Sequence, residues 1–288
     1  MLRLITAALS AALLAMSGCD GDDGGGVKTL RVSGSTTVNP VAADAAQALH
    51  GKFHATVDAQ GGSAGGIAQL AAGQVEIAMS SKEVGKDDHE QFPNVRFTTT
   101  QIGADAVGIV VRREVVDGGL KSVDRVQLQR IFEGHVKNWK ELGGPDLDVF
   151  VYDKEPGRGT REVLDKFLYG EDAKAPAPPD SQRYAIVGGN EETRSKLIST
   201  EGSVAPLSSS FVSGVKQLAL LAVDGVKPSA KTIEDGSYPL ARPLFLITDG
   251  PPSGAAKQFI DYILAPSGQK LVAKHGYVTL AELGRRAR

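Results

Sequence analysis

One pattern recurs along this chain: an apolar strand pattern ends in a loop of glycine and hydroxyl residues, and a helical pattern follows directly. The strand pattern at 29–34 passes through "STT" into helical spacing at 38–53, and the strand pattern at 55–60 passes through "GGSAGG" into 67–73. Strand patterns that alternate with helical ones predict an α/β fold, in which helices cover both faces of mostly parallel sheets.

The same unit returns in the second half of the chain. A strand pattern at 106–113 is followed by a helix that we predict over 122–139, starting from Ser122. The strand pattern at 147–153 leads through "KEPGRG" into a helix that Thr160 is expected to cap. The recurrence extends the α/β prediction over most of the chain.

Composition limits the classes of partner. The chain has 288 residues, of which 41% are hydrophobic, so it can bury a sizeable core, and its length favours two domains. The 32 basic and 34 acidic residues nearly balance, so no basic field is available and we expect no nucleic-acid partner. A charged ligand must therefore be held by a few local groups.

The N-terminal residues have the features of an export signal. Arg3 precedes an apolar run that is too short to span a bilayer, and "MSGC" resembles the bacterial lipobox. We therefore expect a signal peptide over 1–18, lipid on Cys19 and a flexible tether over 19–28. These features place the protein at the periplasmic or extracellular face of the cytoplasmic membrane, anchored by lipid.

Three junctions, "SGSTTV", "GGSAGG" and "EPGRGTR", share one chemistry. Glycine lets a ligand approach the backbone, Ser or Thr supplies a hydroxyl, and a helix N-terminus follows, which favours a desolvated oxyanion. All three lie where strand patterns end, the usual ligand edge of α/β sheets. Lys154, Arg158 and Arg161 add cationic donors at the third junction.

Four segments, "GSTTVNP", "GGSAGGIAQLAAGQVEIAMSSKEV", "YDKEPGRGTREVLDKFLYG" and "GGNEETRSKLISTEGSVA", resemble the phosphate-binding substrate-binding proteins of ABC transporters. The resemblance implies a two-lobed periplasmic-binding-protein fold of type II with two hinge crossings, near "IGADAVG" and "YPLARPL". Residues 27–106 plus 241–288 would then form the first lobe, and 107–240 the second.

The resemblance also assigns ligand contacts to individual positions. It implies that the anion is bound by three loops, formed here by Ser35, Thr36, Thr37, Ser63, Gly65, Ser81, Lys154, Arg158, Gly159 and Thr160. Three of these positions depart from the family pattern. Lys154 stands where Arg is common, Arg158 where Ser is usual, and Ser81 where many relatives have Asp.

The Ser81 departure concerns selectivity. Phosphate near neutral pH still carries a proton that a buried carboxylate can accept, whereas sulfate carries none. We therefore expect weaker discrimination against sulfate, unless Asp58, Asp153 or Glu155 takes the acceptor role.

The implied function is capture of inorganic phosphate and delivery to an ABC permease by a monomer, without catalysis and without a cofactor or metal. Binding or sensing of another tetrahedral oxyanion (sulfate, molybdate or arsenate) stays open as an alternative.

A hydrolase is the remaining alternative. Gly61, Ser63 and Gly65 form G-x-S-x-G, and Asp249 and His275 follow in the chain order of an α/β-hydrolase triad. Against this interpretation, only one convincing strand pattern precedes the motif, and no oxyanion loop of the HGGG type is visible.

Overall fold

The computed structural model describes residues 29–171 and 174–284. The predicted signal peptide, Cys19 and the tether lie outside the described residues. The strands are β1 (Thr29–Gly34), β2 (His54–Asp58), β3 (Ile77–Ser80), β4 (Phe97–Arg112), β5 (Ser122–Val123), β6 (Phe150–Lys154), β7 (Tyr184–Val187), β8 (Ser203–Ser208), β9 (Leu218–Val223) and β10 (Ala241–Asp249).

Helices follow most of the strands, as the recurring pattern predicts. They are α1 (Asn39–Leu49), α2 (Gly62–Ala71), α3 (Lys86–Gln91), α4 (Arg113–Asp117), α5 (Arg125–Phe132), α6 (Gly159–Tyr169), α7 (Asn190–Ser199), α8 (Ala230–Glu234), α9 (Gly254–Leu264) and α10 (Pro266–Lys274), with short 3₁₀ turns at Trp139–Leu142 and Ser209–Val212. None of these helices is both long and apolar enough to cross a membrane.

The strands form two parallel groups joined by two long antiparallel strands. The order along the sheet is β2-β1-β3-β10-β4-β8-β6-β7, with β9 and β5 pairing beside β4. β1 is parallel to β2 and β3, and β6 is parallel to β7 and β8, whereas β10 is antiparallel to β3 and β4. The prediction of mostly parallel sheets is therefore correct within each group and wrong where the groups join.

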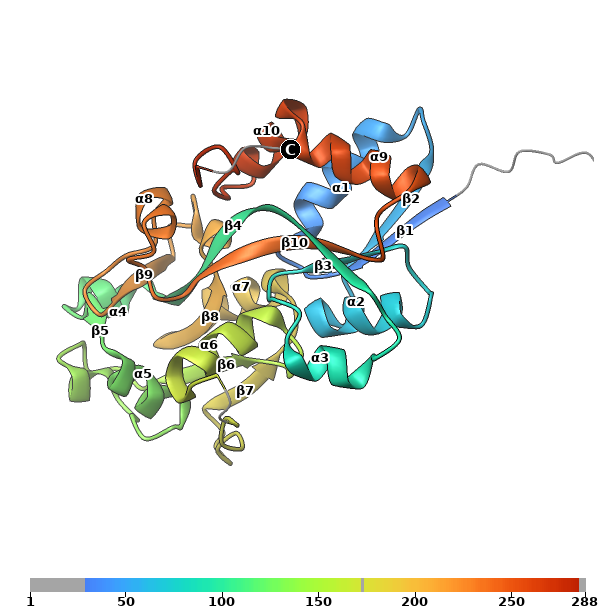
Figure 1. Ribbon diagram of the computed structural model, residues 1–288. Coiled ribbons are helices and arrows are strands. Elements are labelled where there is room, and N and C mark those ends of the chain that lie inside the picture. Colours follow the sequence, from blue (N-terminus) through green and yellow to red (C-terminus); the bar gives the residue numbers. More distant parts are fainter. Residues whose placement is uncertain (1–28, 172–173, 285–288) are drawn as a thin grey trace, which may run out of the picture.

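β4 belongs to both groups. Its residues Phe97–Ala106 pair with β10, and its residues from Val107 to Arg112 pair with β8 and β9. Figure 1 shows β4 and β10 crossing the middle of the molecule between two bodies. We call the body with β1–β3, α1, α2, α9 and α10 the first lobe, and the body with β5–β9 and α5–α7 the second lobe.

Each lobe has its own hydrophobic cores. In the first lobe, the main cluster runs from Leu30 to Tyr277 and includes Phe259. In the second lobe, the main cluster runs from Ala106 to Leu240 around Trp139, which is fully buried and donates its indole N–H to the Gly202 carbonyl at 2.8 Å. Two separate cores allow the lobes to move as bodies.

Two local predictions are wrong. The helix predicted over 122–139 is only α5, because Asp124 rather than Ser122 caps it and Gly134, at φ +71°, ends its last turn. Thr160 does not cap α6. The helix begins at Gly159, so Thr160 lies in the first turn.

Candidate functional site

Four helix N-termini meet around one small cavity between the lobes. α1 and α2 approach it from the first lobe, and α6 and α7 approach it from the second. This small cavity is lined by Ser35, Thr36, Thr37, Gly62, Ser63, Ser81, Lys154, Arg158, Gly159, Thr160, Gly188 and Asn190. The exposed amides and aligned dipoles of these helix ends favour negative charge in the cavity.

The predicted ligand residues lie together here, with one exception. Gly65 does not line the cavity, because α2 already begins at Gly62 and Gly65 faces back toward the preceding turn. Its amide donates to the Gly61 carbonyl at 3.1 Å, and a Cβ added to it would lie 3.3 Å from the Gln60 carbonyl oxygen. Contact between an anion and the other predicted residues stays a prediction.

Three buried serines form the wall of the first lobe. The Ser81 amide donates to Ser63 Oγ at 3.1 Å, and the Ser35 hydroxyl donates to Ser81 Oγ at 3.0 Å. Ser35 Oγ in turn accepts the Thr37 amide at 3.2 Å. Because these bonds join the loops after β1 and β3 to the first turn of α2, the three hydroxyls are held in fixed positions.

The second lobe presses directly against this wall. A Cβ added to Gly159 would lie 2.7 Å from Ser81 Oγ and 2.8 Å from Ser63 Oγ, so only glycine allows this approach. A backbone hydrogen bond also joins the two lobes here, since the Ala64 amide donates to the Gly157 carbonyl at 3.0 Å. The lobes are therefore closed on one another.

Lys154 ends β6 and is 1% exposed. Its ammonium donates to the carbonyls of Gly188 and Gly189, both at 3.2 Å, and to Thr193 Oγ1. All three acceptors are neutral. Burial, together with the neighbouring Arg158 and Arg242, lowers the pKa of Lys154 to about 7. An anion in the cavity would reverse this destabilisation of the ammonium.

The two arginines of the third junction have different positions. Arg158 lines the cavity, where it packs over Gly62 and pairs with Glu155 at 2.7 Å. Arg161 does not line the cavity. It binds Asp153 of β6 and Asp165 of α6 and donates to the Lys154 carbonyl, so it supports the loop and is not placed to contact a ligand.

No carboxylate stands among the residues that line the cavity in the described part of the chain. Asp58 accepts the amide of Ala59 at 2.7 Å, and Glu155 is held by Arg158. Asp153 is buried, accepts from Arg161 and Tyr184, and has its pKa raised by burial. None of the three candidates for the acceptor role of Ser81 therefore reaches the cavity wall in this structure.

Sequence reasoning missed four residues of the site. Gly62, Gly188 and Asn190 line the cavity, and Arg242 lies directly behind Thr37 and Thr160. Asn190 follows the "VGG" turn and begins α7, so the strand, glycine, helix signal that identified the other junctions could have found it. Arg242 carries no such local signal, because it sits in a strand.

The hydrolase triad is not assembled. Ser63 Oγ contacts Ser81, whereas His275 Nε2 lies 3.0 Å from Asp44 and Asp249 accepts the Arg96 amide at 3.0 Å. Among the residues that the structure describes, no histidine is therefore placed to act as a base for Ser63. The loop that contains the G-x-S-x-G motif instead brings the backbone of Gly62 and the hydroxyl of Ser63 to the cavity.

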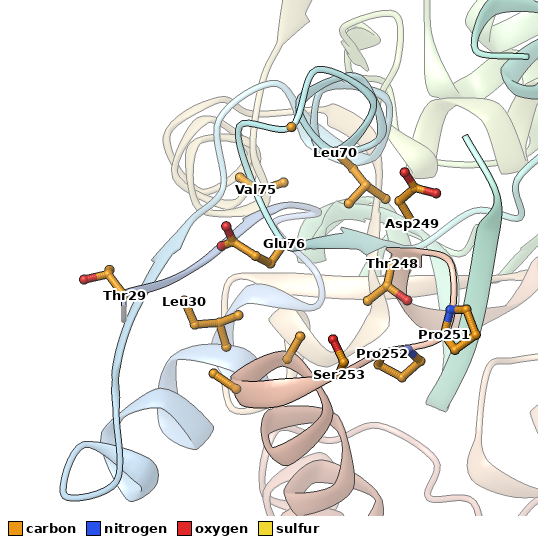
Figure 2. Close-up of a pocket in the computed structure, with 13 residues that line it drawn as sticks. Thr29, Leu30, Leu70, Val75, Glu76, Thr248, Asp249, Pro251, Pro252 and Ser253 are labelled. Atoms are coloured by element: carbon orange, nitrogen blue, oxygen red, sulfur yellow. The ribbon is translucent and has the colours of Figure 1, made fainter. Parts of the chain in front are cut away.

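A larger hollow lies at the other end of the first lobe, beside the start of β1 and the end of β10 (Figure 2). Its two carboxylates, Glu76 and Asp249, lie apart, and each is engaged by an arginine, Glu76 by the guanidinium of Arg31 and Asp249 by the Arg96 amide. Within 29–171 and 174–284, no three His, Cys, Asp or Glu side chains are placed to share a metal ion.

Comparison with known proteins gives consistent matches. The model of the PBP superfamily domain matches residues 22–267. The phosphate-binding protein PstS of Bacillus subtilis is 31% identical over 259 residues, which cover 88% of this chain and 82% of that protein.

Solved structures match over similar lengths. A Clostridium perfringens protein, described as a phosphate ABC transporter substrate-binding protein with bound phosphate, aligns with a TM-score of 0.77 at 26% identity, over 88% of this chain and 99% of its own. A Vibrio cholerae phosphate transport receptor, at 24% identity and a TM-score of 0.69, shares the fold over 87% of this chain and 99% of its own.

Proposed function

Because this chain belongs to the PBP superfamily and is a PstS-like phosphate-binding protein, we propose that it captures inorganic phosphate between its lobes and delivers it to an ABC permease. The family match confirms the predicted two-lobed fold. The family is one of solute-binding proteins, so the chain is a binding protein and not an enzyme.

The observation that carries the proposal is the convergence of four helix N-termini on one closed cavity. A dehydrated oxyanion needs many donors at fixed positions, since each unsatisfied oxygen would retain its desolvation penalty. The hydroxyls of the first lobe and the amides at the start of α6 supply such donors, and Lys154 supplies positive charge.

We also propose the lobe boundaries given by the resemblance, 27–106 plus 241–288 and 107–240. The two main hydrophobic cores support them, since one extends from Ala106 to Leu240 and the other lies on both sides of that range. Ligand entry then requires opening about the crossings in β4 and β10, and closure buries the anion in a site of low dielectric.

Proteins of this family act outside the cytoplasm. We propose that the mature chain is held at the outer face of the cytoplasmic membrane by lipid on Cys19, with the following residues as a tether. We further propose that it works as a monomer, because one copy supplies every wall of the cavity.

Calorimetric titration of the chain from Asp20 to Arg288 tests the function. After removal of bound ligand, phosphate, arsenate, sulfate and molybdate are each titrated at neutral pH. We expect phosphate to bind, and Lys154→Met to weaken phosphate binding by about 10- to 100-fold, because the variant loses the buried positive charge beside the cavity.

Lys274→Met is the matched control, because Lys274 pairs with Asp44 on the outer surface. Absence of binding to all four anions would overturn the function. Sulfate binding equal to phosphate binding would assign the site to tetrahedral oxyanions in general, as the lack of a carboxylate in the lining allows.

A further inference from the structure

Arg242 is the second residue of β10 and is 2% exposed, although it carries a full positive charge. Its Nε and Nη2 donate to Asp105 Oδ2, at 3.0 and 2.7 Å. Asp105 stands opposite Arg242 in the register of β4 and β10, where the chain crosses between the lobes. The guanidinium is therefore fixed by a buried carboxylate on the neighbouring strand.

The remaining donors of Arg242 reach both lobes. Nη1 donates to Thr160 Oγ1 at 2.9 Å, and Nη2 donates to Thr37 Oγ1 at 3.0 Å. Thr37 lies in the loop before α1, and Thr160 lies in the first turn of α6. One planar group thus holds a hydroxyl of each lobe at the cavity.

These contacts determine the direction in which the hydroxyls donate. Thr37 Oγ1 also accepts from Asn190 Nδ2 at 3.0 Å, so both of its lone pairs are used and its proton must go elsewhere. Thr160 Oγ1 likewise accepts from Arg242. Within the described chain the structure shows no acceptor for either proton, and both threonines line the cavity.

We infer that Arg242 is a positioning residue that turns the hydroxyls of Thr37 and Thr160, one from each lobe, into donors to the bound anion. The inference rests on the proposed function. Arg242 does not line the cavity, so it acts through the two threonines. The two threonines belong to different lobes, so the guanidinium can bond to both hydroxyls only when the lobes are closed. Both hydroxyls are therefore turned toward the anion only in the closed form.

Two variants separate positioning from simple charge. Arg242→Lys keeps the positive charge, but a lysine ammonium lacks the rigid fork that reaches Asp105 and both threonines. Asp105→Asn adds net positive charge beside the cavity while it releases the guanidinium. If Arg242 acted only through its charge, Asp105→Asn would bind phosphate as tightly as the wild type or more tightly. If Arg242 acts by orienting the two hydroxyls, Asp105→Asn should bind phosphate more weakly.

The experiment is calorimetric titration with inorganic phosphate, using the chain from Asp20 to Arg288, which retains every described residue. We expect Arg242→Lys and Asp105→Asn each to weaken binding at least tenfold. In a Thr37→Val, Thr160→Val background, Arg242→Lys should change the affinity less than twofold, because its targets are gone. Arg112→Lys is the control, since Arg112 pairs with Glu114 away from the cavity.

Thermal unfolding of each variant establishes that it is folded before titration, and Asp105→Asn carries the test alone if Arg242→Lys does not fold. Unchanged or tighter phosphate binding by Asp105→Asn would overturn the inference. So would a loss from Arg242→Lys that persists undiminished in the valine background. If the wild type itself binds no anion, the proposed function fails instead.

Discussion

Lys154 is the residue whose charge state depends most directly on the cavity. Its ammonium is buried, bonded to three neutral acceptors and close to two arginines. Desolvation and the positive neighbours both favour the neutral amine, whereas a bound anion would favour the ammonium. Protonation of Lys154 and anion binding should therefore be coupled.

The pKa of Lys154 in the unliganded protein is lowered to about 7. Below pH 7 the ammonium is present before and after binding, so this group has no effect on the pH dependence. Above pH 7 binding must take up a proton, so affinity falls by up to about tenfold per pH unit.

Lys154→Arg should remove this dependence, because a guanidinium stays charged. We expect the ratio of wild-type to variant phosphate Kd to rise between about pH 7 and pH 9 and to be flat below pH 7. Taking the ratio cancels the ionisation of phosphate itself. Calorimetry in two buffers of different ionisation enthalpy measures the proton uptake directly, and parallel pH profiles for the two proteins would contradict the coupling.

At the residue scale, the sequence identifies those residues of the site that lie next to a glycine-rich loop. Ser63, Thr160 and Lys154 could be predicted because each stands beside a glycine-rich junction. Arg242 could not, since its role depends on the pairing of β10 with β4 and on contacts to residues 82 and 205 positions away in the chain. Its spacing from Thr37 and Thr160 contains no periodic pattern.

Among the elements, α6 matters most for the site, because its first turn is the part of the second lobe that meets the serine wall. Gly159 makes this meeting possible, since its missing side chain leaves room for the hydroxyls of Ser63 and Ser81. The approach distance between the lobes is therefore set by one residue at a helix start.

Gly159→Ala should weaken phosphate binding at least tenfold without lowering the stability of the unliganded protein. Gly159 does not have a positive φ, so its backbone conformation accepts alanine, but the added Cβ would lie 2.7 and 2.8 Å from the two serine hydroxyls. Titration and thermal unfolding together check both effects.

Gly51→Ala is the matched control for this variant, since an added Cβ there meets nothing within 4 Å. If Gly159→Ala retained wild-type affinity, the close contact between the start of α6 and the three serines would not be required for closure.

The elements themselves were predicted well where the strand, loop, helix unit is regular, as in β1 to α2. They were predicted poorly where tertiary pairing decides. β4 begins at Phe97 rather than at 106, because its polar first half is held by β10. The two-residue strand β5 exists only because it pairs with β9.

At the scale of the whole molecule, one ion pair outside the cavity joins the two closed lobes. Lys82 follows β3 in the first lobe and is 8% exposed. Its ammonium lies 2.6 Å from Asp88 Oδ2 in its own lobe and 3.1 Å from Glu162 Oε2 on α6 of the second lobe. Opening the lobes would separate the second contact.

Lys82→Gln should therefore favour the open form and weaken phosphate binding by roughly fivefold, equivalent to about 1 kcal/mol. X-ray scattering should show a contraction of the wild type on adding phosphate, and the variant should need more phosphate to reach it. Lys86→Gln is the control, because Lys86 pairs with Glu90 of its own helix, at 3.5 Å. Scattering profiles that do not change with saturating phosphate would contradict closure.

The central place of β10 also imposes an order of events while the chain is being made. β10 lies between β3 and β4 in the sheet, yet the ribosome adds it after every strand of the second lobe. The second lobe can pair its strands as soon as Val223 has emerged. The first lobe, although it is begun earlier, lacks its connection to β4 until Asp249 has been added. The chain thus completes its lobes in the reverse of the order in which it starts them, and a protein cut short before β10 would lack Arg242 and the strand that joins the first lobe to β4.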